Sequence, residues 1–114
     1  MSEKSAIAGT MMAFATYKAK EGMHDTLMEL VKCHIPTLRE NGLITDKTSY
    51  TAISADGTVI EVFEWVNNDA VRTAHSHPAI SAIWDKMIEV ADFIPMKDLP
   101  EAGRPFPGFA MMEL

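Results

Sequence analysis

The segment Thr58-Val-Ile-Glu-Val-Phe-Glu-Trp-Val66 predicts a strand whose side chains are apolar on both faces. Alternate residues of a strand point to opposite sides, so its apolar residues divide into Ile60, Val62 and Val66 on one side and Val59, Phe63 and Trp65 on the other. A strand of this kind needs cover on both faces. Because the helices of so short a chain cover only one face of a sheet, the segment predicts that the other face contacts a second subunit.

The sequence on either side of this strand predicts a small α+β fold. Ala55-Asp56-Gly57 precedes it, and Asp-Gly between two β-type runs is a strong hairpin signal, which makes residues 43–54 the partner strand. The other expected elements are a strand over 11–19, a helix over 23–41, a short helix from Asn67 or Asn68 to Ser76, a helix over 79–91 and a last strand within 106–114. This βαββαβ order predicts a ferredoxin-like fold with an antiparallel four-stranded sheet.

The first helix, over residues 23–41, is predicted to be amphipathic. Its apolar residues recur at the spacing of one helix face, namely Met23, Leu27, Leu30, Val31, Ile35 and Leu38. Asn41-Gly42 predicts the C-terminal end of the helix. Pro36 points away from the apolar face, so we expect a kink in the outer backbone. The charged side chains are predicted to face solvent on that outer side: Glu29, Lys32, Arg39 and Glu40.

The composition indicates one acidic domain over residues 1–114, with a core at about 10–99 and a tail at 100–114. The formal charge of −6 argues against binding to nucleic acid or to anionic membranes, because both need a basic face. The single cysteine, Cys33, excludes an intramolecular disulfide. Met1-Ser-Glu-Lys-Ser5 lacks the pattern of a signal peptide, and no run reaches the length of a membrane span, so we expect a cytoplasmic protein.

Four features taken together resemble one known group of proteins. They are a strand that ends in a Lys-Glu-Gly turn (Tyr17 to Gly22), the helix end Leu38-Arg-Glu-Asn-Gly42, Glu64-Trp65 followed by Ala70 and Ala74-His75, and His77-Pro78 through Trp84 with Phe93-Ile-Pro-Met96 after it. Over about residues 10–99 the chain resembles the dimeric α+β barrel superfamily, and within it proteins like the antibiotic biosynthesis monooxygenases.

The resemblance implies a homodimer in which two sheets face each other and each subunit has its own pocket between sheet and helices. It also implies a small hydrophobic or aromatic ligand. Members include oxygenases without a cofactor, in which the anion of a phenol or quinol reacts directly with oxygen, so that the protein supplies a base, hydrogen-bond donors and an apolar cage. The haem-degrading branch carries an Asn on its first strand, and residues 11–19 contain none. We therefore expect neither haem nor another cofactor.

Two histidines are candidates for the catalytic base. His75 matches the Ala-His pair of the family and lies at the edge of the apolar face of the short helix, and His34 lies within the apolar face of the first helix. A histidine at the edge of an apolar face is suited to act as a base near neutral pH. The alternative is that both are structural, His75 bonding the loop before Pro78 and His34 a core or dimer-contact residue. Without carboxylates at helical spacing beside His34, no metal site is expected.

Aromatic side chains are candidates for the wall of a ligand pocket: Tyr50, Phe63, Trp84, Phe14 and Trp65. Tyr50 adds a hydroxyl that orients a phenol or quinone, although aromatic residues on such elements also serve as plain core. On the third predicted strand, Glu61 and Glu64 are expected to be buried on opposite faces, one toward the helices and one toward the barrel, where Glu64 makes a dimer-interface hydrogen bond.

The sequence thus predicts a cofactor-independent monooxygenase-like protein for a small aromatic or quinone-type compound. Two alternatives stay open. One is a homodimer of the same fold that binds a hydrophobic metabolite without chemistry. The other is a structural or stress-related dimer whose pocket is filled by its own side chains.

Overall fold

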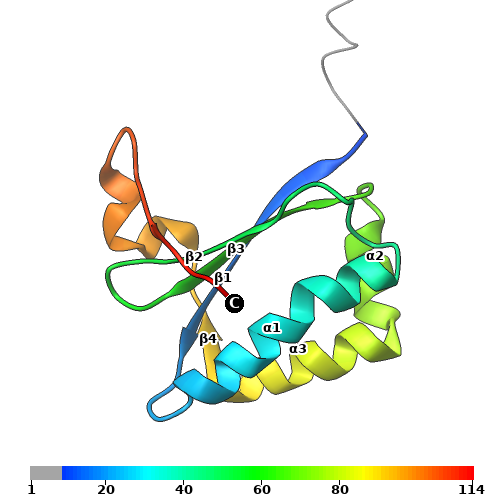
Figure 1. Ribbon diagram of the computed structural model, residues 1–114, viewed down its shortest axis with the longest axis horizontal. Coiled ribbons are helices and arrows are strands. Elements are labelled where there is room, and N and C mark those ends of the chain that lie inside the picture. The colour runs from blue at the N-terminus through cyan, green and yellow to red at the C-terminus, as the bar shows by residue number, and fades with distance from the viewer. Residues whose placement is uncertain (1–8) are drawn as a thin grey trace, which may run out of the picture.

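The computed structural model describes residues 9–114 and is an α+β fold with one five-stranded antiparallel sheet (Figure 1). Its helices and strands follow the chain as β1 (Met11–Ala19), α1 (His24–Glu40), β2 (Tyr50–Ile53), β3 (Val59–Trp65), α2 (Ala70–Ser76), α3 (Pro78–Val90), β4 (Ala91–Phe93) and β5 (Ala110–Met111). The strands lie in the order β4-β1-β3-β2-β5. The segment in which no export signal is predicted, Met1–Ser5, lies outside the described residues.

Strand β3 lies at the centre of the sheet and pairs with both β1 and β2. In this register Glu61 lies opposite Ala15 of β1 and opposite Thr51 of β2. The three helices lie on one side of the sheet (Figure 1). The side chains of β3 that face them are all buried: Val59, Glu61, Phe63 and Trp65. They pack with α1 and α3 into two apolar clusters that meet at Trp84.

The other face of the sheet is covered only in part, by the chain that follows β4 (Figure 1, orange). This C-terminal segment, residues 94–109, is attached where Ile94 N–H donates to the Thr16 carbonyl over 3.1 Å and where Ala55 N–H donates to Glu101 Oε2 over 2.9 Å. Ile60 is buried on this face, yet Phe14 and Tyr50 are 45% and 53% exposed. Helices therefore cover one face of β3 and leave much of the other open.

Turn chemistry explains why the strands and helices end where the sequence predicts. Gly57 has a φ of 90°, a value that glycine adopts without steric cost, and Ser54 N–H donates to the Thr58 carbonyl across the hairpin. Gly42, with a φ of 70°, likewise ends α1 directly after Asn41. Pro78 begins α3 at a position that needs no N–H donor, and the His77 ring caps the helix by accepting from Ala79 N–H.

Several boundaries differ from the sequence-based expectation. The first helix and the central strand are each one residue shorter at both ends than the expected ranges 23–41 and 58–66. The strand expected over residues 43–54 is reduced to Tyr50–Ile53, and only an isolated bridge joins Ile44 to Trp65. Asp69, rather than Asn67 or Asn68, is the N-cap position of α2. The helix predicted over 79–91 is observed as Pro78–Val90, and Ala91 is the first residue of β4.

The sheet has five strands where four were expected. The strand expected within 106–114 is β5, and it lies beside β2 at one edge of the sheet. The strand β4, which the sequence did not indicate, follows α3 without a loop and pairs with the end of β1 at the opposite edge. Both edge strands are too short to give a periodic pattern, so their positions depend on long-range pairing. In residues 9–114 no helix is both long and apolar enough to cross a membrane.

Candidate functional site

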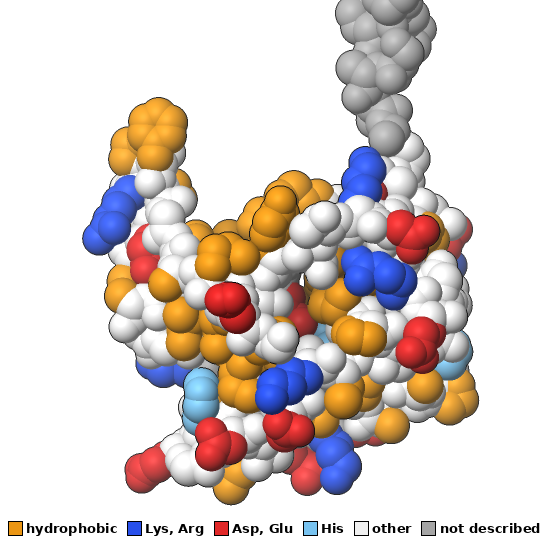
Figure 2. Space-filling view, in the orientation of Figure 1, with side chains coloured by type: hydrophobic (Ala, Val, Ile, Leu, Met, Phe, Trp, Pro, Cys, Tyr) orange, Lys and Arg blue, Asp and Glu red, His pale blue; other side chains and the backbone are white. Residues whose placement is uncertain are grey.

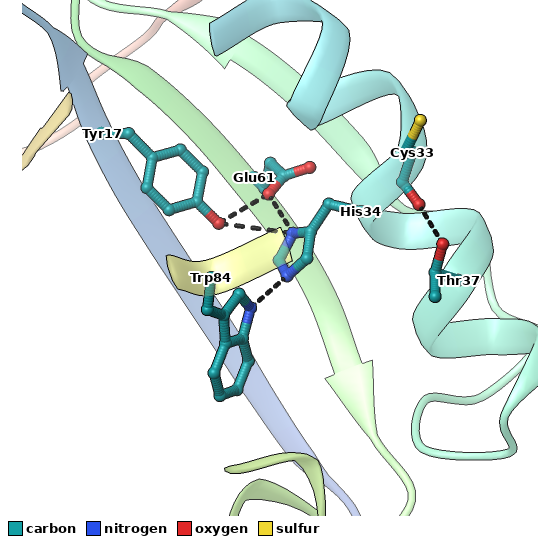
Figure 3. Close-up of polar contacts among 6 residues, drawn as sticks. All are labelled: Tyr17, Cys33, His34, Thr37, Glu61 and Trp84. Atoms are coloured by element: carbon teal, nitrogen blue, oxygen red, sulfur yellow. Dashed lines mark hydrogen bonds and ion pairs between the residues drawn. The ribbon is translucent and has the colours of Figure 1, made fainter. Parts of the chain in front are cut away.

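Four side chains from four different elements form a hydrogen-bonded network beneath helix α1 (Figure 3). Tyr17 OH donates to Glu61 Oε1 over 2.7 Å, and His34 Nδ1 lies 2.7 Å from the same oxygen. On the other side of the ring, Trp84 Nε1 donates to His34 Nε2 over 2.8 Å. His34 and Glu61 are 2% and 0% exposed, so the network is shielded from water.

The hydrogen bonds fix the protonation state of His34. An indole N–H can only donate, so His34 Nε2 must be the acceptor and carries no proton. The ring is therefore neutral with its proton on Nδ1, and that proton is donated to the Glu61 carboxylate. Two donors thus converge on Oε1 of Glu61, one from the imidazole and one from the Tyr17 phenol.

The second oxygen of Glu61 is buried and has no hydrogen-bond partner among residues 9–114. It points away from Tyr17 (Figure 3). A buried carboxylate oxygen without a donor costs free energy, and it is available to accept a proton or a hydrogen bond from a ligand. The phenol of Tyr17 is affected as well. Burial, the negative charge of Glu61 and the hydrogen bond to Glu61 together raise the pKa of Tyr17 well above 10.0.

The local sequence explains how these groups meet. Tyr17 and Glu61 lie on the helix-covered face of neighbouring strands, where Tyr17 is the diagonal neighbour of Glu61. His34 lies between buried Val31 and Leu38 on the inner face of α1 and therefore points to the sheet. Trp84 reaches the ring from α3, which packs beside α1.

A cleft of about 410 Å³ opens between α1 and the strand β2, within the size range of small-molecule sites. Its wall on α1 is formed by Val31, Lys32, Ile35, Pro36 and Arg39, and its other wall by Ser49, Thr51 and Leu114. Figure 2 shows this hollow between the helix and the strands. Thr51 is the cross-strand neighbour of Glu61, and Val31 and Ile35 flank His34 on the helix. The cleft and the polar network are therefore separated by a single layer of side chains.

Arg39 differs from the solvent-facing side chain that the helix pattern predicts. It is partly buried at the wall of the cleft, where its Nε donates to the Thr45 carbonyl over 3.2 Å and its Nη2 to the Lys47 carbonyl over 3.0 Å. The loop over residues 43–49 folds back over the end of α1 and supplies these carbonyls, which helical periodicity alone does not indicate. Lys32, which the helix pattern also placed on the solvent side, is a second residue that lines the cleft.

Three of the predicted site residues are brought together on the helix-covered face. The ring of Phe63 lies 6.1 Å from that of His34, and the ring of Trp84 lies 6.2 Å from it. Trp65 stands behind Phe63, at 5.1 Å, and belongs to the buried core. His75 is exposed and packs edge-on against Trp84, with 4.8 Å between ring centroids. In the described part of the chain its ring makes no hydrogen bond, so it is not part of the network.

The other two aromatic candidates, Phe14 and Tyr50, lie elsewhere. Both flank Val62 on the open face of the sheet, on the far side from His34. Tyr50 lines a smaller hollow there, of about 220 Å³, together with Met12 and Glu64. A single pocket on either face cannot contain all five of the aromatic residues that the sequence suggested.

The two glutamates of β3 face opposite sides, as the alternation predicts. Glu64 lies on the open face, where Oε1 accepts from the Thr45 hydroxyl and Oε2 accepts from Thr10 and Lys47. These donors, Thr45 first, lower the pKa of Glu64 below its usual range. These hydrogen bonds of Glu64 are made within its own chain, and the hydrogen bond expected across a dimer interface stays a prediction.

Sequence reasoning did not identify Tyr17 or Arg39 as members of the site. Tyr17 was seen only as the start of the Lys-Glu-Gly turn, although a tyrosine at an inward position of a predicted strand needs a partner for its hydroxyl. In the described residues no group of three or more His, Cys, Asp or Glu side chains is placed to share a metal ion. No family model, curated protein or solved structure matches the chain.

Proposed function

We propose that the protein is a cofactor-independent oxygenase that takes a small phenol, quinol or related aromatic compound into the cleft between α1 and the sheet. The observation that carries the proposal is the buried Glu61–His34 pair, in which one carboxylate oxygen has no partner among residues 9–114 and Glu61 is the cross-strand neighbour of Thr51 in the wall of that cleft. The resemblance to the antibiotic biosynthesis monooxygenases supports the same function. The aliphatic side chains of Val31, Ile35 and Pro36 in the wall suit the face of an aromatic ligand and support it as well.

In the proposed reaction Glu61 accepts the proton of the substrate. His34 and Tyr17 donate to Oε1 and hold the carboxylate in place, which leaves Oε2 for the substrate. The substrate anion gives up electrons to oxygen, and a carbon–oxygen bond forms. For a CH₂ group beside a phenol-type ring, one oxygen atom becomes the new carbonyl and the other leaves as water, so both reducing electron pairs come from the substrate. The protein supplies the base and the dry cage.

This assignment changes the role expected of the histidines. Both ring nitrogens of His34 are engaged, Nδ1 with Glu61 and Nε2 with Trp84, so His34 acts as a positioning residue for Glu61. His75 lies outside the network and is not assigned a part in proton transfer.

The test is oxygen uptake by purified protein with a panel of anthrone-, naphthol- and quinol-type compounds. We expect uptake above background in the wild type, a loss of about 100-fold or more in Glu61→Gln, and a smaller loss in His34→Gln. His75→Ala, which changes a histidine outside the network, is the matched control and should keep full activity. Circular dichroism of each variant separates lost chemistry from lost fold. Equal uptake by wild type and Glu61→Gln would refute the assignment of the base.

A binding protein without chemistry is the second candidate. It is favoured by the complete burial of Glu61 and by the use of His34 Nε2 by Trp84, because both keep the polar groups away from a ligand in the cleft. Saturable binding of the panel without any oxygen uptake would favour this candidate.

We propose further that the fold is ferredoxin-like and that two copies form a dimeric α+β barrel. The order β4-β1-β3-β2 supports the first point, with β5 as an added edge strand. The open sheet face supports the second, because Met12, Phe14 and Tyr50 expose large apolar surfaces there. A reducing compartment such as the cytoplasm suits the free, exposed thiol of Cys33.

Light scattering after gel filtration tests the assembly. We expect the mass of two chains for the wild type and of one chain for Phe14→Asp, which places a charge on the open face. Val71→Asp, on the exposed outer side of α2, is the control and should leave the mass unchanged. A wild-type protein with the mass of one chain would contradict the dimer.

A further inference from the structure

Arg39 carries a positive charge that no carboxylate neutralises in the described part of the chain. Its hydrogen-bond partners in residues 9–114 are the carbonyl oxygens of Thr45 and Lys47, which hold the guanidinium in a fixed orientation and leave its charge intact. A guanidinium has five N–H donors, and only two of its nitrogens are used here. The remaining nitrogen, Nη1, is free to bind an anion at the wall of the cleft.

The surroundings of Arg39 strengthen this positive site. Lys32 lines the same cleft, and its ion pair with Glu29, at 3.4 Å, joins two exposed side chains one helix turn apart. Such a pair contributes little and is easily exchanged for a ligand. Within residues 9–114, no aspartate or glutamate lines the cleft, although the whole chain has a net charge of −6. The cleft is therefore a cationic hollow on an acidic protein, which attracts anions.

The remaining side chains that line the cleft are uncharged and are either aliphatic or hydroxyl-bearing. Val31, Ile35 and Pro36 give α1 an aliphatic wall, and Thr51 on the other wall is the cross-strand neighbour of Glu61, one of whose carboxylate oxygens has no partner among residues 9–114. We infer that the cleft binds an amphipathic aromatic anion, with its carboxylate or similar acidic group at Arg39 and its hydroxyl directed at Glu61. The position of the hydroxyl rests on the proposed function, whereas the anionic end rests on Arg39 and Lys32 alone.

The two polar groups come from opposite walls of the cleft, because Arg39 lies on α1 and Glu61 lies on β3 beside the lining residue Thr51. A ligand that reaches both therefore carries its hydroxyl and its acidic group at opposite ends, as a fused two-ring hydroxylated aromatic acid does. The inference thus narrows the substrate class from any phenol to a hydroxylated aromatic acid.

The experiment compares three probes that differ in one group each. We use 6-hydroxy-2-naphthoate, 2-naphthol, which lacks the carboxylate, and 2-naphthoate, which lacks the hydroxyl, and we measure binding by fluorescence titration. For the wild type we expect 6-hydroxy-2-naphthoate to bind at least about tenfold more tightly than 2-naphthol. We also expect its affinity to fall with added salt, because a partly exposed ion pair is screened.

Variants of Arg39 test which side chain makes the difference. Arg39→Gln should weaken binding of both naphthoates by about tenfold or more and leave 2-naphthol within about twofold. Arg39→Lys keeps the charge and should retain part of the preference. Arg72→Gln, which removes an exposed arginine of α2 outside the cleft, is the matched control and should change nothing. If Arg39→Gln does not fold, Arg39→Lys and the salt dependence of binding to the wild type show whether a positive charge at position 39 binds the carboxylate.

The outcomes separate this inference from the proposed function. Equal affinities for 6-hydroxy-2-naphthoate and 2-naphthol, an Arg39→Gln variant that binds both naphthoates normally, or no binding of any probe would overturn the inference. Oxygen uptake with 6-hydroxy-2-naphthoate and with 2-naphthol, combined with equal affinities for the two that Arg39→Gln leaves unchanged, would leave the oxygenase proposal standing and the anion site refuted. Anion binding that depends on Arg39, without oxygen uptake for any probe, would support the site and refute the oxygenase.

Discussion

Glu61 and Glu64 lie three residues apart on strand β3, and the sheet separates them. Glu61 is buried under α1, where it accepts from a tyrosine and a histidine and keeps one oxygen without a partner. Glu64 lies on the open face, where two threonines and a lysine donate to its two oxygens. The same residue type on the same strand is therefore fully satisfied on one face and incompletely satisfied on the other.

This difference shows where the molecule keeps a chemically available group. A carboxylate with three donors is a stabilised anion and has little tendency to take up a proton. A buried carboxylate with a free oxygen is costly, and such groups are candidates for a functional role. Of the two glutamates of β3, Glu61 is therefore the one available for chemistry.

The largest expected difference between the two glutamates is in the free energy of unfolding that is lost when each carboxylate is removed in turn. Glu61→Ala leaves the buried Nδ1–H of His34 and the Tyr17 hydroxyl without their acceptor, and we expect each unsatisfied donor to lower the free energy of unfolding by about 1–3 kcal/mol. Glu64→Ala loses only half-exposed contacts and should cost far less. Urea denaturation of both variants measures the difference. Similar losses for the two would mean that the sheet does not divide them as described.

Tyr17→Phe tests the hydrogen bonds around buried Glu61, and we expect an intermediate loss of stability. It removes one hydrogen bond to a carboxylate and should cost about 1.5–3 kcal/mol at neutral pH. The pKa of Tyr17 is raised in the fold, so the phenol stabilises the protein fully below pH 10.0, and this contribution is lost as the pH rises from there through the folded pKa. The wild type should therefore lose stability at alkaline pH, and Tyr17→Phe should lose less over that range. Identical alkaline profiles would contradict the burial of the phenol.

Glu64→Gln should give the smallest effect, confined to acid pH. The folded pKa of Glu64 lies below its usual 4.5, so its contribution is present above pH 4.5 and is lost as the pH falls through the folded value. Denaturation as a function of pH should show a shallower acid limb in Glu64→Gln. Part of the limb should remain, because Asp56, whose pKa is held at about 2 first of all by the Ser54 hydroxyl, titrates there as well. An unchanged acid limb would mean that the three donors do not stabilise the anion.

Much of the fold followed from local patterns in the sequence. The alternation in residues 58–66, the glycines at positions 42 and 57, and the His77-Pro78 pair each determine backbone geometry over a few residues, and each was read correctly. The strand β4 and the position of β5 were not predicted, because strands of three and two residues carry no periodicity and are held by partners far away in the chain.

The candidate site was predicted only in pieces. His34 and Trp84 were named, and Glu61 was expected to be buried, but their meeting depends on how α1 and α3 lie across the register of β1 and β3. Tyr17 joins them because it is diagonal to Glu61, which requires knowledge of that register. Arg39 was assigned to solvent because helical angles say nothing about a loop that folds back over the helix.

The two edges of the sheet have a consequence for the behaviour of the chain in concentrated solution. Strand β4 pairs with β1 only over residues 17–19, and β5 pairs with β2 only at Ala52 and Ile53. Over residues 11–15 the backbone of β1 therefore has no strand partner on its outer side in the described part of the chain. Unpaired edges of this kind are the templates on which proteins add strand to strand and grow into fibrils. At high concentration, strand addition is therefore expected along this part of β1 rather than at the short strands β4 and β5.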